Sequence, residues 1–331
     1  MNKKQGNDSL GRREFLTRCT KAGLSLAVVG GVAYWFYDPA GPSGKEETGI
    51  ISGLPDFSVS GMGNRMAVAR GSDRVKTIQL AFKAIGGLES YIKGGDRVLL
   101  KVNAAFASPP MLCATSHPDL VAEVVRLCLK AGASSITVTD NPINDPASCF
   151  ALSGIGKAAR EAGAKVVLPR KESFRTFTLE GGKLIREWPL LYEPLQSANK
   201  VIGIAPVKDH HRSGASMTLK NWYGILGGRR NIFHQDIHNI IKELSMLLRP
   251  TFVILDGTTT MMRNGPTGGS LSDLKDTNTM IVSTDSVAAD AYGATLLGRT
   301  LDELVFIRKA EEEGAGTSDY ESLNPQIVST S

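Results

Sequence analysis

Residues 208–221 contain most of the side chains that could bind or activate an anionic ligand. This stretch carries two lysines, an arginine, two adjacent histidines, an aspartate and an asparagine. Lysine, arginine and asparagine donate hydrogen bonds that suit carboxylate or phosphate groups. Histidine transfers protons near neutral pH or binds a metal. A solvated loop with a few charges is the alternative interpretation. The residues of interest in this stretch are Lys208, His210, His211, Lys220 and Asn221.

Polar residues also stand at the ends of the apolar runs that we predict to be strands. Such runs occupy residues 98–100, 136–139, 201–207 and 251–255. If these strands are parallel, the residues at their carboxyl ends collect along one edge of the sheet, where open α/β sheets bind ligands. Polar residues that end strands only for solubility are the alternative. The strand-end residues are Lys101, Asn103, Asp140, the 208–211 group and Asp256.

These residue types suggest a division of roles within one site. We expect Lys208 and Lys220 to hold an anion and His210 to act as an acid, a base or a ligand. Asp256 would orient the substrate or bind a metal. His210 and His211 are adjacent on an extended segment, so their rings should point to opposite sides.

Further ligand contacts are predicted from two loops and one helix start. The glycine-rich residues 264–269, including Asn264 and Gly265, could place backbone N–H groups around an anion, or could be an ordinary surface loop. Asp285 is a natural helix N-cap and is also predicted to bind substrate, together with Lys101, Asn103, His211 and Asn221.

Metal and cofactor chemistry is left open by the sequence. His234 and His238 are four residues apart and would share a helix face, but no glutamate motif accompanies them. The cysteines lack the C-x-x-C spacing, so neither an iron–sulfur cluster nor a structural zinc site is expected. Cys113 and Cys149 are a candidate disulfide pair, because both fall in loops after neighbouring predicted strands. A bound metal is compatible with the site, but its identity is unknown.

Strand and helix patterns alternate along the chain and predict an α/β fold. The mostly parallel sheet would have helices on both faces, with a strand–helix–strand unit over residues 97–140. Between residues 174 and 188 the hydrophobic period changes to two, and Gly181-Gly182 would turn the chain into a second strand over residues 184–188, which predicts a β-hairpin insertion. We predict that the α/β domain spans residues 65–315.

The N-terminal residues resemble a targeting segment. Arg12 and Arg13 precede Phe15-Leu16 and a weakly apolar run of about fifteen residues, which is short for a membrane span. This pattern resembles a twin-arginine signal, an address read by the twin-arginine translocase. We therefore assign residues 1–37 to a signal or anchor, with residues 22–37 as a candidate membrane tether. The expected location is the periplasm or the outer face of the cytoplasmic membrane.

The segments that flank the predicted domain look loosely structured. Residues 38–64 are rich in Gly, Pro and Ser and predict a flexible linker. Residues 316–331 predict a loose C-terminal tail. The net charge is only +5 and aromatic residues make up 6% of the chain, so no nucleic-acid surface is expected.

Taken together, several of these segments resemble a known family, the domain of unknown function 362. The resemblance covers about residues 66–300. It implies the α/β fold but no defined activity. A fainter similarity runs to the nickel-dependent lactate racemases, which also have a strand followed by a His-containing Gly/Ser segment with a lysine. The segments that carry the family resemblance are 98–103, 132–140, 208–224, 256–257 with 264–268, and 285–298.

Two classes of function remain. The first is an exported enzyme that acts on a small anionic substrate. The second is a non-catalytic ligand-binding or accessory protein of the cell envelope that uses the same site.

Overall fold

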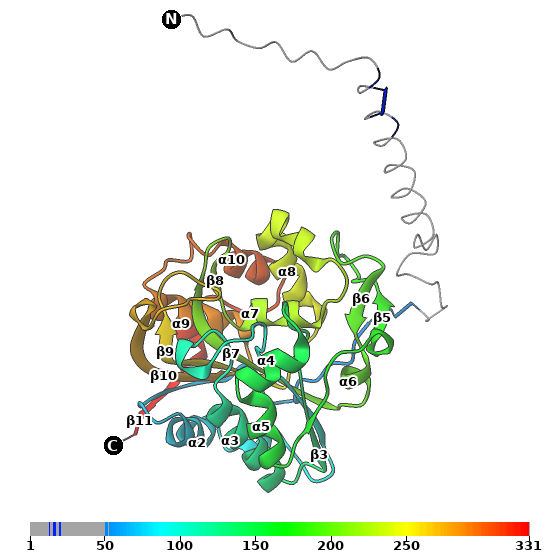
Figure 1. Cartoon of the computed structure of the whole chain (residues 1–331). Coiled ribbons are helices and arrows are strands. Elements are labelled where there is room, and N and C mark those ends of the chain that lie inside the picture. Colours follow the sequence, from blue (N-terminus) through cyan, green and yellow to red (C-terminus); the bar gives the residue numbers. More distant parts are fainter. Residues whose placement is uncertain (1–12, 14–15, 18–19, 21–49, 52, 331) are drawn as a thin grey trace, which may run out of the picture. The chain divides into compact units, whose positions relative to one another are not determined.

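The computed structural model describes residues 13, 16–17, 20, 50–51 and 53–330. The chain divides into two compact units, residues 1–48 and residues 49–331, and the second holds the sheet and its helices (Figure 1). Arg12 and nearly all of the predicted signal and tether lie outside the described residues. Within the described part of the chain, no helix has the length and apolar character needed to cross a membrane.

The domain is built on a nine-stranded mixed sheet in the order β11-β1-β10-β9-β7-β2-β3-β4, with β8 paired to β7. The pairs β9/β7, β7/β2, β2/β3, β3/β4 and β1/β11 are parallel, whereas β1/β10, β10/β9 and β7/β8 are antiparallel. The strands are β1 (Met66–Arg70), β2 (Arg97–Lys101), β3 (Ser135–Thr139), β4 (Lys165–Val166), β7 (Lys200–His210), β8 (Gly214–Ser216), β9 (Phe252–Met261), β10 (Leu274–Ser283) and β11 (Gln326–Ser329).

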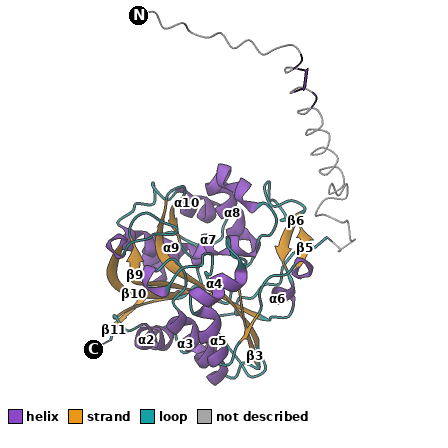
Figure 2. Ribbon diagram, in the orientation of Figure 1, coloured by secondary structure: helices purple, strands orange, loops and turns teal. Residues whose placement is uncertain are grey.

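Helices cover both faces of the sheet, which confirms the predicted α/β class (Figure 2). One face packs against α2 (Arg74–Ala84), α3 (Pro118–Lys130), α4 (Pro146–Leu152) and α5 (Ile155–Glu161). The other packs against α6 (Glu193–Gln196), α7 (Thr218–Asn221), α8 (Ile237–Leu247), α9 (Ser286–Leu297) and α10 (Val305–Glu312). Short 3₁₀ helices lie in the connections between these elements: η1 (Leu88–Ser90), η2 (Pro110–Leu112), η3 (Lys171–Ser173), η4 (Trp222–Ile225), η5 (Arg230–Asp236), η6 (Leu271–Asp273) and η7 (Tyr320–Leu323).

The strands read as unbroken apolar runs because both of their faces are buried. Along β2, Val98 and Leu100 join one core cluster, while Leu99 joins the other. Side chains alternate between the two faces of a strand, so a strand covered on both sides has apolar residues at every position. Each such side chain contributes about 1.5–3 kcal/mol by leaving water.

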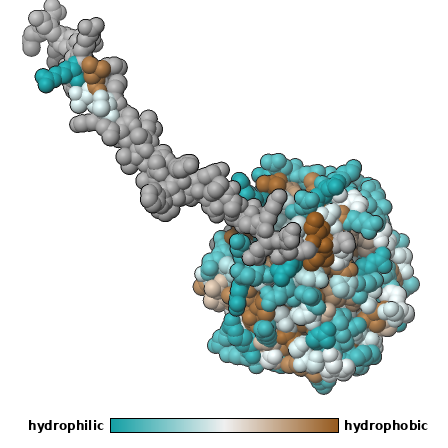
Figure 3. Space-filling model, turned by 90° about the vertical axis from the view of Figure 1, so that its right-hand side faces the viewer, coloured by the Kyte–Doolittle hydropathy of each residue, from teal (hydrophilic) through white to brown (hydrophobic). Residues whose placement is uncertain are grey.

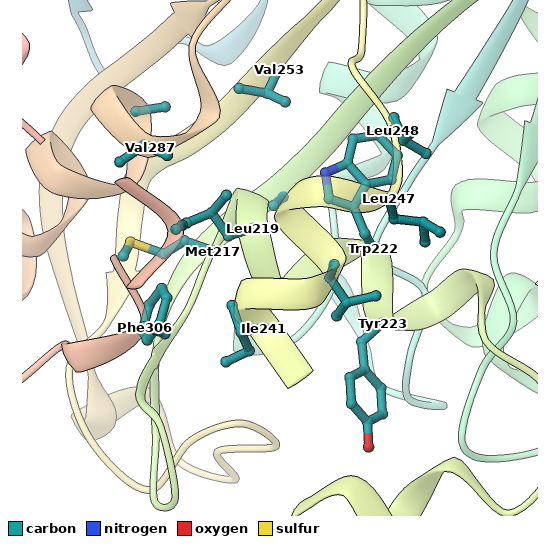
Figure 4. Close-up of a cluster of buried hydrophobic side chains, with 14 of the residues drawn as sticks. Met217, Leu219, Trp222, Tyr223, Ile241, Leu247, Leu248, Val253, Val287 and Phe306 are labelled. Atoms are coloured by element: carbon teal, nitrogen blue, oxygen red, sulfur yellow. The ribbon is translucent and has the colours of Figure 1, made fainter. Parts of the chain in front are cut away.

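The segment α7–η4 is held between the sheet and the surrounding helices by a cluster of apolar side chains. Figure 4 shows Met217, Leu219 and Trp222 packed with Ile241 of α8 and Val287 of α9. This packing fixes the position of the polar residues that alternate with the apolar ones along α7. The outer surface is different in character, since apolar residues are scattered among hydrophilic ones over the face drawn in Figure 3.

The predicted hairpin exists, but its second strand starts later than the sequence indicated. β5 (Phe174–Phe177) pairs with β6 (Trp188–Leu191) to form a separate two-stranded sheet. Residues 184–187, which were predicted as strand, belong to the connection. The reason is Glu243 of α8, whose buried carboxylate accepts hydrogen bonds from the backbone N–H groups of Lys183, Leu184 and Ile185.

The described residues of two segments that were predicted to be loose pack into the domain. Of the predicted linker, Ile51 bridges to Phe177 of β5, and Phe57 is only 1% exposed with its N–H bonded to the Arg249 carbonyl. Of the predicted tail, β11 pairs in parallel with β1. Both predictions therefore differ from the structure, because composition alone does not reveal backbone pairing to a distant strand.

Candidate functional site

A cavity of about 490 Å³ lies beyond the carboxyl ends of β2, β3 and β7, which are neighbours in the sheet. Most of the polar strand-end residues meet here, as the sequence predicted. Its wall includes Lys101, Asn103, Asp140, Lys208, His210, His211, Lys220, Asn221, Tyr223, Arg230, His234, Asn264 and Gly265.

Lys101 is neutralised by a complete set of partners. Its Nζ lies 2.8 Å from Asp140 Oδ1 and donates to the Val102 carbonyl and to Asn221 Oδ1. Gly224 borders this pair, and a Cβ there would collide with Asp140 Oδ1 and with Lys101 Nζ. Because all three ammonium protons are used, Lys101 has no donor left for a ligand.

Lys208, near the end of β7, is buried and has no acidic partner among the described residues. Its Nζ donates to the Ala114 carbonyl at 2.5 Å and to Asn103 Oδ1 at 3.3 Å, and it lies 5.2 Å from the centre of the Phe106 ring. Burial, reinforced by the charge of Lys220, lowers the pKa of Lys208 to about 7. One ammonium proton remains for a ligand.

Lys220 of α7 is the least constrained cation in the cavity. Its Nζ lies 5.1 Å from the centre of the Tyr223 ring. Across the described residues, no hydrogen-bond acceptor or carboxylate pairs with this amine. Burial, together with the charges of Arg230 and Lys101, lowers the pKa of Lys220 to about 7.

Arg230 and Tyr223 fasten the loop that closes one side of the cavity. The Arg230 guanidinium donates to the carbonyls of Tyr223, Leu226, Asn141 and Pro142. The Tyr223 hydroxyl donates to the Arg230 carbonyl, and in Figure 4 this hydroxyl points away from the apolar cluster. The guanidinium thus joins the loop after β3 to the η4–η5 segment.

Three histidine rings stack along the cavity. The rings of His210 and His211 are parallel with centres 5.0 Å apart, and His234 lies 5.9 Å from His210. The prediction that His210 and His211 face opposite sides was wrong, because β7 ends at His210 and the chain turns there. His238 lies apart in α8 and does not line the cavity.

The hydrogen bonds fix different tautomers for these rings. His210 Nδ1 accepts from the backbone N–H groups of Arg212 and Ser213, so in the neutral ring the proton must sit on Nε2. His211 Nδ1 lies 3.3 Å from the Gly265 carbonyl, which only accepts, so this nitrogen carries the proton. Burial and the charge of Lys220 lower the pKa of His210 to about 2. His210 therefore offers an uncharged N–H donor.

The same tautomer argues against His210 as a metal ligand. A neutral histidine that binds a metal through Nε2 must carry its proton on Nδ1, which here is an acceptor. Among the residues that the structure describes, no three His, Cys, Asp or Glu side chains are grouped to hold a metal ion.

Asp256 lies outside the cavity, contrary to its predicted role there. β9 does not end at Asp256 but continues to Met261. The Asp256 carboxylate faces α2 and forms an ion pair with Arg74 at 2.8 Å. This pairing gives Asp256 a partner in the core and removes it from the predicted site.

Three further predicted binding residues have structural partners. Asp285 caps α9 through the N–H groups of Val287 and Ala288 and lies on a different cavity. Asn264 lines the site, but its amide donates to Asp273 Oδ1. Gly265 contributes backbone only, since its N–H donates to Asp209 Oδ2 and a side chain there would collide with the Asp209 carbonyl.

The cysteines that the structure describes, Cys113, Cys128 and Cys149, are all free and buried. The predicted Cys113–Cys149 pair is therefore not formed. Burial raises the pKa of the Cys149 thiol to about 11 and that of Cys128 to about 12, which keeps both protonated at neutral pH.

Several cavity residues were not predicted from the sequence. Phe106 lies in a loop, whereas Tyr223 and Arg230 lie in the short 3₁₀ helices η4 and η5, which have no periodic pattern in the sequence. Arg229 and Arg230 are adjacent, and nothing local distinguishes the buried arginine from the exposed one. The sequence signal for Tyr223 and Arg230 was proximity to the predicted 208–221 segment, and that for Phe106 was proximity to the strand-end residue Asn103.

Comparisons with known proteins give relatives of limited similarity. A thylakoid-associated protein of Synechocystis sp. is 24% identical over 262 residues, which is 75% of each chain. The lactate racemase apoprotein from Thermoanaerobacterium thermosaccharolyticum matches with a TM-score of 0.40 and 14% identity over 73% of this chain and 58% of that one. A Thermotoga maritima protein matches with a TM-score of 0.35 and 10% identity over 73% of this chain and 59% of that one. At these TM-scores the two likenesses carry no conclusion about activity.

The model of one protein family, described as a domain of unknown function (DUF362), matches residues 98–295. This range includes β7, the 208–221 segment and most of β2 and α9, and it contains all of the residues that line the cavity. The chain belongs to the DUF362 family.

Proposed function

We propose that the protein is an enzyme that binds a small anionic substrate, a carboxylate or a phosphate, in the cavity beyond β2, β3 and β7. One observation carries this proposal. The cavity wall holds Lys208 and Lys220 without an acidic partner, because Asp140, the carboxylate in the wall, is already paired with Lys101.

Burying a charged amine without a counter-ion costs free energy. A charged amine that leaves water without a counter-ion loses several kcal/mol of hydration energy, so its pKa falls. The pKa of both Lys208 and Lys220 is lowered to about 7. An anionic ligand would restore the missing countercharge and recover part of this energy, which favours binding of anions over neutral molecules.

The remaining donors fit a small ligand with a few acceptor atoms. Lys208 has one free proton, Lys220 has its whole amine, and His210 offers Nε2–H. These donors belong to separate elements, the end of β7 and α7, so a ligand that accepts from all of them would be oriented as well as bound.

Binding is tested by calorimetry with a panel of small carboxylates and phosphates. We expect Lys208→Met to weaken the best ligand at least tenfold, the order expected for a charged hydrogen bond of about 1.5–3 kcal/mol. Lys157→Met is the matched control, because Lys157 is exposed on α5 and pairs only with Glu161. Equal affinity in wild type, Lys208→Met and Lys157→Met would contradict the proposed site.

Catalysis is tested separately by following each bound ligand by NMR in the presence of the protein. Conversion that is lost in His210→Ala supports an enzyme. A ligand that binds at the cavity and is recovered unchanged under all conditions supports the non-catalytic binding role.

The location proposed for this activity is the periplasm or the outer face of the cytoplasmic membrane, after export by the twin-arginine translocase. The support is the sequence around Arg12 and Arg13 alone. Replacement of both arginines by lysine should retain the protein in the cytoplasm, as measured by fractionation. Unchanged export would contradict this route.

A further inference from the structure

Lys220 differs from the other cations of the cavity in having nothing to hold its amine. Lys101 uses all three of its protons, and Lys208 donates two hydrogen bonds. The Arg230 guanidinium is bound to four carbonyl groups. Among the described residues, the Lys220 Nζ forms no hydrogen bond or ion pair and lies over the face of the Tyr223 ring. It is therefore the one amine of the described cavity wall whose lone pair a ligand can reach without breaking a hydrogen bond.

The backbone that carries Lys220 is anchored, so the lysine side chain starts from a fixed point in the cavity wall. Lys220 lies on α7 between Leu219 and Asn221, which are both buried. The start of α7 is anchored by Asp290 of α9, which accepts from the N–H groups of Thr218 and Leu219. Because the backbone is already in place, only the rotamers of the lysine side chain have to be ordered when the substrate arrives.

We propose that Lys220 is a nucleophile that forms an imine with an aldehyde or ketone group of the substrate, while Lys208 binds the anionic group of the same molecule. This inference rests on the proposed function and narrows the substrate to small oxo acids or carbonyl-bearing phosphates. The geometry that supports it is the unpaired amine in a cavity shared with a second, partly free lysine.

The reaction needs no component beyond the substrate and water. The lone pair of the neutral Lys220 amine attacks the carbonyl carbon, so a C–N bond forms and the carbonyl oxygen takes up a proton. The nitrogen loses a proton to give a carbinolamine. Loss of the hydroxyl group as water then gives the imine, with no change of oxidation state.

The surroundings keep a useful fraction of the amine neutral at physiological pH. The charged groups that act on it are Lys101 and Arg230, and their charges add to the effect of burial. A lysine that is desolvated beside another cation is the arrangement that activates amines for imine formation. The other titratable side chains that line this cavity are Asp140, Lys208, His210, His211, Tyr223 and His234.

The test is reductive trapping with glyoxylate, a small aldehyde that carries a carboxylate, in the presence of cyanoborohydride. The full chain is treated at pH 7 and the carboxymethylated lysines are located by peptide mass spectrometry. We expect Lys220 to be labelled at least about tenfold faster than exposed lysines such as Lys157, because about half of its amine is neutral at this pH. The rate at Lys220 should level off above about pH 7, whereas labelling of exposed lysines continues to rise.

Matched variants separate nucleophilicity from charge. Lys220→Arg keeps the positive charge and should abolish the fast adduct, whereas Lys157→Arg should leave it unchanged. Lys208→Met should slow trapping of glyoxylate at Lys220 but not trapping of propanal, which has no carboxylate to bind. Circular dichroism spectra of all variants check that they are folded.

The possible failures of the two proposals are distinguishable. Labelling that follows exposure, with Lys220 no faster than Lys157, overturns the imine proposal even where calorimetry shows anion binding that depends on Lys208. Fast labelling of Lys220 that is equal for glyoxylate and propanal supports a reactive amine and contradicts the anion-binding role of Lys208.

Discussion

Lys208 and Lys220 give anion binding a pH dependence with a defined sign. In the free protein their pKa values are about 7, and an anion in contact raises them by favouring the charged forms. Below pH 7 both amines are already charged, and the affinity should change little. Above pH 7 binding must be accompanied by proton uptake, so the affinity should fall as the pH rises.

Calorimetry of sulfate binding at pH 8, in two buffers with different ionisation enthalpies, measures this uptake directly. Sulfate is chosen because it has no carbonyl group and keeps its charge over this range. We expect uptake of about one proton or more, with a smaller value in Lys208→Met. Zero uptake at pH 8 would mean that both lysines are charged before the anion arrives.

His210 should remain neutral far below the usual range of histidine. Its pKa is lowered to about 2 by burial and neighbouring cations, whereas the unfolded chain takes up a proton near 6.5. Stability linked to His210 is therefore present above pH 6.5 and falls by about 1.4 kcal/mol per pH unit below it. Nitrogen-15 NMR at pH 5 should show a proton on Nε2 of His210, and a charged ring there would contradict the tautomer.

The sequence identified most of the polar residues of the cavity but not their individual duties. The sequence predicts Lys101 and Asn103 because they stand at the end of a recognisable strand. It predicts Lys208 and Asn221 because they belong to the polar 208–221 segment. Asp256 also stands at the end of an apolar run, but the prediction that it lies in the cavity was wrong. β9 continues to Met261, and the Asp256 carboxylate forms an ion pair with Arg74. Which partner a strand-end residue meets depends on helices distant in sequence, and no local pattern encodes that.

At the scale of elements, the start of α7 is hydrogen-bonded to one buried carboxylate of another helix. Asp290 of α9 accepts hydrogen bonds from Thr218 N, Thr218 Oγ1 and Leu219 N. We expect Asp290→Ala to lower the free energy of unfolding by about 2–4 kcal/mol and to weaken anion binding, since α7 carries Lys220. Asp290→Asn keeps an acceptor and should lose less of both. Chemical denaturation and calorimetry measure the two effects.

The same pair of variants has a pH signature. Burial raises the pKa of Asp290 to about 7, so the folded state holds a proton that the unfolded state releases near pH 3.8. The linked stability is complete below pH 3.8 and is lost as the pH rises through 7. Wild-type stability relative to Asp290→Asn should therefore decrease from pH 5 to pH 8. A constant difference would contradict the raised pKa.

Glu243 plays the corresponding role for the hairpin insertion. Its carboxylate is 1% exposed and accepts from three consecutive backbone N–H groups at residues 183–185. Glu243→Ala leaves these donors buried and unpaired, so we expect a loss of about 2–4 kcal/mol in urea denaturation. Glu313→Ala is the control, because Glu313 is more exposed and contacts only Lys242. An equally small loss of unfolding free energy in Glu243→Ala and Glu313→Ala would show that water molecules accept the hydrogen bonds that the Glu243 carboxylate accepts in the wild type.

The hydrophobic period predicted which elements exist, but contacts between distant residues set their limits. The sequence indicated a second hairpin strand over residues 184–188, and Glu243 converts the first part of it into a turn. Alternation of apolar and polar residues is compatible both with a strand and with a turn over residues 184–187. The pattern shows which side chains are apolar, but it does not show that the backbone N–H groups are already hydrogen-bonded to Glu243.

At the scale of the whole molecule, the last strand closes one edge of the sheet. β11 pairs Ala67 with Gln326 and Arg70 with Ser329, so residues near the two ends of the domain are hydrogen-bonded to each other. Most β11 side chains are exposed, which explains why the sequence predicted a loose tail: the strand contributes backbone pairing rather than apolar burial. Without β11, the edge of β1 would present unpaired N–H and C=O groups to solvent.

Truncation after Asn324 tests this contribution. We expect the shortened protein to lose about 1–3 kcal/mol of unfolding free energy, from a few net backbone hydrogen bonds, and to aggregate more readily through the exposed β1 edge. Truncation after Thr330 retains all of β11 and should behave as wild type. Anion binding should be unchanged in both proteins, because β1 and the cavity are separated in the sheet by β10 and β9. A shortened protein with wild-type stability would show that pairing of β11 with β1 is energetically neutral. A selective loss of anion binding would show instead that the far edge of the sheet is coupled to the cavity.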